Sequence, residues 1–146
     1  MTNADILKIA MKQHSIDANC SPDDFVKEDS VVVISKPNAK ARRYLNLPFF
    51  CDLITYGYNI VASVDERVLE FVQKYIDTKY PHACFETPQI HHLTNSFVKY
   101  GFLPCYQAEY WLPNADALHE LSCGYEMRLL RPEDFKNLYL PQWSNA

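Results

Sequence analysis

The stretch FCDLITYGYNIVASVDERVLEFVQKYI, residues 50–76, decides the fold class of this chain. Residues 50–56 alternate apolar and polar side chains well enough to predict a strand, and a second strand follows over residues 60–63. Gly57 and Asn59 lie between them and supply the chemistry of a tight turn. The two strands are therefore predicted to form a hairpin.

A helix is predicted directly after this hairpin. Ser63 and Glu66 stand three positions apart, which is the spacing of a capping box at a helix start. An apolar stripe with helical spacing follows: Val64, Val68, Phe71, Val72, Tyr75 and Ile76. Tyr80-Pro81 ends the helix, because the residue before a proline is pushed away from helical backbone angles.

The residues before the hairpin predict one helix, one strand and two shorter elements. Asn3 is expected to cap a first helix that runs to about His14. A short helical turn is expected within residues 20–25. The continuous β-branched run at residues 31–34 predicts a fully buried strand, and residues 39–45 predict a short helix.

The residues after the central helix predict a short strand over residues 83–85 and then a further helix. Thr87 is expected to cap that helix with Pro88 at its first position, and Gly101 to end it in a left-handed conformation. Residues 105–111 alternate again and predict a long strand. Strands and helices are intermixed, so the expected fold class is α/β (α+β), with a mixed β-sheet flanked by helices.

Composition indicates an ordinary globular chain with one main domain, expected over residues 1–121. The chain has 146 residues, of which 48% are hydrophobic, enough for one core. Its formal net charge of −4 argues against nucleic acid as a partner, because such binding rests on neutralising phosphates. No run approaches the eighteen or so apolar residues of a membrane span, so no membrane partner is expected.

The amino terminus and the cysteines indicate a cytoplasmic protein. The first residues have neither a basic region nor a long apolar run, so no secretory signal is expected. The five cysteines are an odd and scattered set. Such a set favours free thiols in a reducing compartment.

Residues 122–146 have the pattern of the beginning of another domain. Tyr125, Met127 and Leu129 alternate with charged residues, as in a half-buried strand, and Pro132 with the two acidic residues after it predicts the first turn of a helix. Further apolar residues follow: Phe135, Leu138, Tyr139, Leu140 and Trp143. We expect these residues to be the first strand and helix of a domain that is otherwise missing.

This tail resembles the first strand and helix of the acetyltransferase domain in the GNAT superfamily, where a strand, Arg-Pro-Glu-Asp and an apolar helix commonly begin the catalytic fold. The part before it is similar to the amino-terminal half of two-domain GNAT acetyltransferases from Gram-positive bacteria. Five segments carry that resemblance: Phe49-Phe50, residues 54–61, residues 84–86, residues 99–101 and residues 109–113.

The resemblance implies a parent enzyme that transfers an acetyl group from acetyl-CoA to an amine, with the missing catalytic domain as a partner of this chain. The family holds acetyl-CoA with a loop of the form Gln/Arg-x-x-Gly-x-Gly/Ala, whose backbone N–H groups bind the pyrophosphate. This chain departs from that pattern, since its only glycines, Gly57, Gly101 and Gly124, are isolated. We therefore expect no cofactor and no catalytic residue in this chain, which alone is expected to be inactive.

The aromatic strand expected over residues 105–111 carries the candidate substrate site. Tyr106, Glu109, Tyr110 and Trp111 could line a pocket for an amine, although core packing is the simpler interpretation. Two alternatives to the GNAT hypothesis remain. The first is a stand-alone module that binds a small molecule along residues 102–111. The second is an interaction protein that forms a homodimer or swaps its tail through the carboxyl-terminal strand and helix.

Two other groups of residues have functional interpretations. His82, Cys84, His91 and His92 have side chains that could bind zinc or activate a thiol, but their spacing favours surface histidines and a buried cysteine. Lys36, Lys40, Arg42 and Arg43 form a basic run that could attract a phosphate or an acidic partner. A solvated helix face is the simpler interpretation of that run.

Overall fold

The sheet of this α+β fold has three strands, in the order β1-β3-β2. The computed structural model describes residues 1–103, 107–120 and 122–135. The chain divides into two units, Met1–Asp116 and Ala117–Ala146, and the sheet lies in the first. The expected mixed sheet with flanking helices is confirmed.

The hairpin predicted from the sequence forms the antiparallel half of this sheet. Strand β2 (Cys51–Thr55) pairs antiparallel with β3 (Ile60–Val64). Gly57 has a φ of 100° in the connecting turn, an angle that a residue without a Cβ adopts at little cost.

The strand predicted over residues 31–34 is present as β1 (Val31–Ile34), which pairs parallel with β3. The expectation that it is fully buried is wrong, because all four residues are half-buried. The strand order puts β1 at an edge of the sheet and β3 in the centre. The central strand is the one whose residues are all buried.

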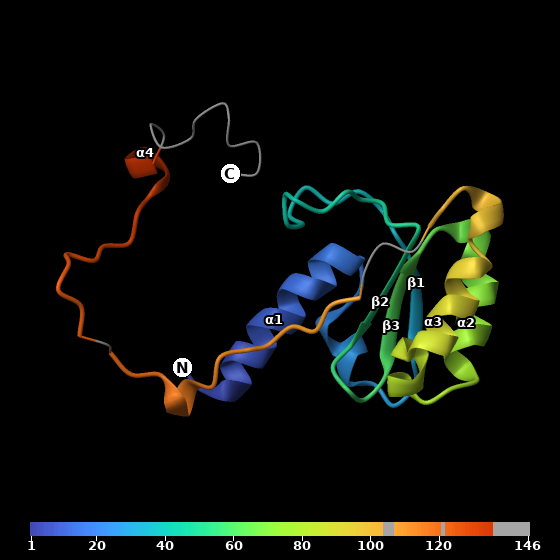
Figure 1. Ribbon diagram of the computed structural model, residues 1–146, viewed down its shortest axis with the longest axis horizontal. Helices are drawn as coiled ribbons and strands as arrows, with labels where there is room; N and C mark the ends of the chain where they lie inside the picture. Colours follow the sequence, from blue (N-terminus) through green and yellow to red (C-terminus); the bar gives the residue numbers. More distant parts are fainter. Residues whose placement is uncertain (104–106, 121, 136–146) are drawn as a thin grey trace. The chain divides into compact units, whose positions relative to one another are not determined.

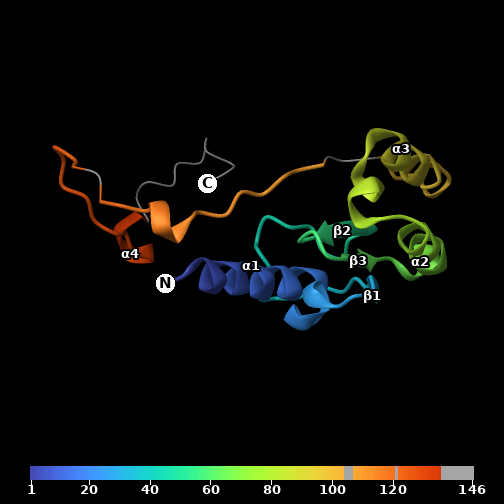
Figure 2. The same cartoon turned by 90° about the horizontal axis from the view of Figure 1, so that it is seen from below.

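Helices cover both faces of the sheet. Helix α1 (Asn3–Ala18) lies on one side, and helices α2 (Leu69–Asp77) and α3 (Thr87–Asn95) lie on the other, as Figures 1 and 2 show. None of the helices within the described residues is long and apolar enough to cross a membrane.

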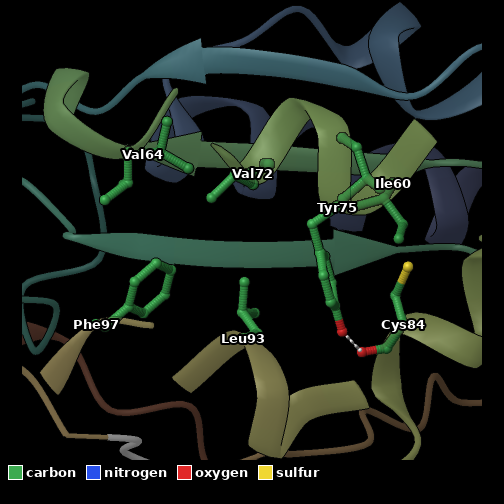
Figure 3. Packing of buried hydrophobic residues seen from close by; sticks show 10 residues of the cluster. Ile60, Val64, Val72, Tyr75, Cys84, Leu93 and Phe97 are labelled. Carbon is green, nitrogen blue, oxygen red and sulfur yellow. Dashed lines mark hydrogen bonds between the residues drawn. The ribbon is translucent and has the colours of Figure 1, made fainter. Parts of the chain in front are cut away.

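The larger core lies between the sheet and the pair α2 and α3, and Figure 3 shows it closely. Alternate residues of the central strand, Ile60, Ala62 and Val64, face this core. Tyr75 of α2 belongs to it, and its hydroxyl donates a 2.7 Å hydrogen bond to the carbonyl of Cys84. The other buried members are Val68, Val72, Ile76, Cys84, Leu93 and Phe97. The predicted apolar stripe is thus mostly buried, although Phe71 is exposed.

Helix α1 begins one residue earlier and ends four residues later than the sequence predicted. Thr2 is the cap, and it forms a capping box with Asp5. Asn3 is not the cap, because its side chain instead bonds to Asn114 and to the backbone N–H of Ala115. The helix continues past His14 to Ala18, where Asn19 ends it with a φ of 62°.

The capping box predicted at Ser63 and Glu66 is absent. Ser63 lies within β3, and Asp65 caps the next turn by accepting the backbone N–H of Arg67. That turn is the short 3-10 helix η2 (Glu66–Val68), which leads into α2. Because Ser63 pairs in the sheet, it does not cap the helix as its spacing from Glu66 had predicted.

Two short elements also differ from their predictions. Residues 39–45 form turns instead of a helix, because the backbone N–H of Arg42 donates to the side chain of Asp17. Residues 83–85 belong to the 3-10 helix η3 (Pro81–Phe85) instead of a strand. A third 3-10 helix, η1 (Pro22–Val26), confirms the helical turn expected within residues 20–25.

The helix predicted to start at Thr87 is α3, and it ends earlier than expected, at Asn95. The 3-10 helix η4 (Val98–Tyr100) follows, and Gly101 ends it with a left-handed φ of 82°, as predicted. Thr87 is not the cap, since that position belongs to Glu86.

The long strand predicted over residues 105–111 is wrong in its described part. Residues 107–114 form no strand and are exposed, so their alternating pattern has no sheet partner there. Residues 105 and 106 lie outside the described residues. A further 3-10 helix, η5 (Ala115–Ala117), comes after this segment.

The described part of the second unit has one regular element, the helix α4 (Pro132–Phe135). It begins at the predicted proline, and the carboxylate of Asp134 accepts the backbone N–H of Arg131. The strand predicted over residues 125–129 is not formed, since these residues have neither regular secondary structure nor a partner strand in the described part of the chain. Leu138, Tyr139, Leu140 and Trp143 lie outside the described residues.

Candidate functional site

Side chains on the α1 side of the sheet form a polar cluster, which we call the Asp52 cluster: His14, Asp17, Arg42, Asp52, Tyr56 and Ser63. Strand β2 contributes Asp52 to it. Cys51 and Leu53 pack into the larger core, whereas Ile54 and Tyr56 pack against Met11 and Phe25 on the other face. Asp52 lies between Cys51 and Leu53 in the strand, so its side chain is on the α1 side.

Ser63 reaches the same face from the central strand. It is the residue directly opposite Asp52 in the antiparallel pair. Its neighbours Ala62 and Val64 face the larger core, so its hydroxyl is directed toward α1. Ser63 is 0% exposed, and its Oγ has no hydrogen-bond partner within the described residues.

An ion pair joins the last turn of α1 to the loop before β2. Arg42 Nε lies 2.5 Å from Asp17 Oδ2, and the backbone N–H of Arg42 donates to Oδ1 of the same carboxylate. Gln13 donates a further hydrogen bond to Oδ1. The loop is also held by Asn38, whose side-chain amide donates to the carbonyl of Ile16. These contacts place the Arg42 guanidinium beside the α1 face of the sheet.

The carboxyl of Asp52 is poorly compensated. Burial raises its pKa to about 6, with the negative charge of Asp17 acting in the same direction and Arg42 opposing both. Within the described part of the chain, no hydrogen bond reaches its oxygens. Arg42 is already engaged by Asp17, which explains why its charge does not hold the pKa of Asp52 near its ordinary value.

Two members of the cluster, His14 and Tyr56, contact each other, and Tyr110 packs against His14. His14 Nδ1 lies 2.6 Å from the hydroxyl of Tyr56. Burial and the charge of Arg42 lower the pKa of His14, opposed by Asp17, and a neutral imidazole can accept the Tyr56 hydroxyl at that nitrogen. The ring of Tyr110 packs edge-on against His14 at 5.9 Å between centroids.

A hollow of about 460 Å³ opens in the loop between β1 and β2. It is lined by residues of the loop between β1 and β2: Pro37, Asn38, Ala39, Ala41, Arg42, Arg43, Leu45, Asn46 and Leu47. Arg42 belongs both to this hollow and to the Asp52 cluster. The basic run predicted as a helix face is thus a folded loop, with Lys36, Lys40 and Arg43 exposed on it.

Three of the four residues predicted to line a substrate pocket lie on the irregular segment 107–114. Glu109, Tyr110 and Trp111 are exposed, and Tyr106 lies outside the described residues. Tyr110 is brought to the edge of the Asp52 cluster by its contact with His14. Tyr110, one of the four predicted pocket residues, therefore contacts a member of the cluster.

The histidine and cysteine residues considered for metal or thiol chemistry are not brought together. Among the described residues, no group of three or more potential ligands could hold a metal ion. Cys84 is buried in the larger core, and burial raises the pKa of its thiol, opposed by Lys79. The simpler interpretation of Cys84 as a core residue therefore agrees with its surroundings.

Sequence reasoning missed the Asp52 cluster. Asp17, Arg42, Asp52 and Ser63 come from a helix, a loop and two strands, so nothing in their spacing predicts that they meet. One signal was present, because Asp52 is an acidic residue inside a strand whose neighbours are apolar. An acidic residue at such a position is rarely buried unless it has a partner.

Comparisons with known proteins identify no relative. No family model, curated protein or solved structure matches this chain.

Proposed function

We propose that this chain is the amino-terminal, supporting or substrate-side domain of a GNAT-like N-acetyltransferase. The parent enzyme would transfer an acetyl group from acetyl-CoA to an amine. Residues 1–121 would supply structural support and one wall of the amine site. Residues 122–146 would begin the catalytic domain, which is the partner of the first unit.

The observation that carries this proposal is the exposure of an alternating apolar row in the tail. Tyr125, Met127 and Leu129 are 86%, 78% and 94% exposed, and they alternate with Glu126 and Arg128. A period-two row of this kind suits a strand with one buried face. Its apolar side chains and backbone groups are available to a sheet formed by further residues.

Acetyl transfer to an amine needs groups that position the amine, accept its proton and stabilise the thioester oxygen. It also needs a site for the pyrophosphate of acetyl-CoA, which the family builds from a glycine-rich loop. The isolated glycines of this chain offer no such loop. We therefore assign acetyl-CoA binding to the catalytic domain.

Calorimetry with acetyl-CoA tests whether residues 1–146 lack a site for this cofactor. The chain of residues 1–146 should release no binding heat, and mass spectrometry of an amine mixture incubated with it should show no acetylated product. A protein that joins the same residues to a GNAT catalytic domain should bind acetyl-CoA. Micromolar binding by residues 1–146 alone would contradict the proposal.

The same exposed row favours a second candidate, a homodimer through the tail. An extended segment with free N–H and C=O groups can pair with a copy of itself, and such pairing would cover Tyr125, Met127 and Leu129. Light scattering of residues 1–146 should then give a dimer that becomes a monomer when residues 124–146 are deleted. A monomer at high concentration with the tail present would exclude this candidate.

A further inference from the structure

The strongest unassigned feature is the pair formed by Asp52 and Ser63 on the α1 side of the sheet. We propose that this pair binds the ammonium group of a small primary amine. The amine would therefore bind on the α1 side of the sheet. Only its role as the acetyl acceptor rests on the proposed function.

The register of the sheet provides the geometry. Asp52 and Ser63 are directly opposite in the antiparallel pair β2 and β3. Directly opposed residues on one face have Cβ atoms about 5 Å apart, so their polar atoms converge on a common space. A carboxylate and a hydroxyl offer three oxygen acceptors there, and a primary ammonium group has three N–H donors.

Both side chains have unused hydrogen-bonding capacity. The Oγ atom of Ser63 is fully buried and unpaired within the described residues. The Asp52 oxygens likewise accept no hydrogen bond from the described part of the chain. Buried polar groups are nearly always paired, and an unpaired one costs stability. A bound donor at this position would satisfy both groups at once.

The charge of the cluster selects a cation. Asp17 and Asp52 carry two carboxylates, and Arg42 supplies one guanidinium. The Nε of that guanidinium and the backbone N–H of Arg42 both donate to Asp17. His14, with its lowered pKa, and the Tyr56 hydroxyl add no charge near neutral pH. An ammonium group would neutralise the remaining negative charge, whereas an anion would add to it.

The Asp52 side of the site is accessible to a small ligand, whereas Ser63 lies beneath the surface. Asp52, Tyr56 and Arg42 are half-buried, so the cluster keeps contact with solvent. Arg42 also lines the hollow in the loop between β1 and β2. Tyr110, on an exposed segment, offers an aromatic ring beside His14.

The test measures amine binding without acetyl-CoA. Ethylammonium chloride is added to the complete chain, and the carboxyl carbon of Asp52 is followed by NMR in protein labelled at aspartate. We expect a saturable shift and a pKa of Asp52 that falls below its unliganded value of about 6, because a bound cation favours the carboxylate. Tetramethylammonium chloride has no N–H donors and should produce neither effect.

Variants locate the binding. Asp52→Asn should abolish the saturable response, read from the backbone amides of β2 and β3. Ser63→Ala should weaken it about tenfold, the loss expected for one hydrogen bond to a charged group. Asp23→Asn changes an exposed aspartate of η1 and should leave the affinity unchanged. Circular dichroism of each variant establishes that the fold is retained.

Two results would overturn the inference: an Asp52 signal that responds equally to ethylammonium, tetramethylammonium and sodium chloride, or unchanged binding in Asp52→Asn. Either result would leave the proposed function standing if acetyl-CoA still fails to bind residues 1–146. Conversely, acetyl-CoA binding by these residues together with a saturable amine response would remove the proposed function and leave the amine site. The two failures are therefore distinguishable.

Discussion

Arg42 and Asp17 form an ion pair whose Nε to Oδ2 distance is 2.5 Å, and the Asp17 side chain is only 2% exposed. The pair connects the last turn of α1 to the loop before β2. Because Arg42 keeps 27% of its side-chain exposure, solvent screens part of the attraction. The buried carboxylate nevertheless depends on its partner, since an unpaired buried charge is strongly unfavourable.

Replacing Arg42 tests that dependence. We expect Arg42→Met to lower the free energy of unfolding by about 2 kcal/mol, because the buried carboxyl group of Asp17 would lose its guanidinium partner. The double variant Asp17→Asn with Arg42→Met should recover part of this loss. Urea unfolding monitored by circular dichroism measures all of them. Arg43→Met is the control, since Arg43 is exposed and makes no ion pair with any described residue; an equal loss there would contradict the assignment.

The raised pKa of Asp52 predicts that stability falls as pH rises through a defined window. Between the ordinary pKa of 3.8 and about 6, the folded protein binds more protons at Asp52 than the unfolded chain does. The free energy of unfolding therefore decreases across this window and stays lower above it. Asp52→Asn removes this effect, so the variant should exceed the wild type by roughly 2 kcal/mol at neutral pH.

Chemical unfolding of both proteins from acid to neutral pH checks this prediction. The lowered pKa values of Asp24, Asp65 and Asp5 change stability in the opposite direction, but they are common to both proteins and cancel in the difference. The difference should disappear below the ordinary pKa of aspartate. A constant difference at all pH values would show that Asp52 titrates normally.

The stack of Phe102 on Phe50 predicts that Phe102, two residues after η4, contributes to the larger core. The two rings are 3.8 Å apart between centroids and nearly parallel. Phe102→Ala should lower the melting temperature, with a loss of about 1 kcal/mol, since the ring is partly exposed and the buried area is modest. Leu103→Ala is the matched control, because Leu103 is largely exposed and should cost less than about 0.5 kcal/mol. Equal effects would contradict the role of the stack.

Removing the tail tests whether the first unit folds by itself. Deletion of residues 122–146 should leave the melting temperature and the near-ultraviolet circular dichroism of the chain unchanged, because both core clusters consist of residues from the first unit. Hydrogen exchange gives a second reading, since the amides of residues 125–129 should exchange rapidly in the complete chain as a monomer. A large loss of stability on deletion would show that the tail is part of the core.

The predictions that held rest on local chemistry. The β2 to β3 hairpin follows from alternation around Gly57, and the buried face of α2 follows from its helical spacing. Gly101 ends η4 as expected, since its left-handed φ favours glycine. In each case the residues that decide the structure are close together in the sequence.

The predictions that failed needed contacts over longer separations. The alternating residues 107–111 and 125–129 have the period of a strand, but a strand also needs a neighbour to pair with, and they have none in the described chain. Residues 39–45 do not form the predicted helix, because the backbone N–H of Arg42 donates to the side chain of Asp17 in α1.

The amino-acid sequence by itself determined the α+β class, the hairpin and the apolar face of α2, because side-chain periodicity and turn residues act over a few positions. Only the tertiary structure decided that Asp52 and Ser63 lie opposite each other, beside the Asp17 and Arg42 pair. These residues come from four separate segments, and sheet register together with helix packing determines which of them meet.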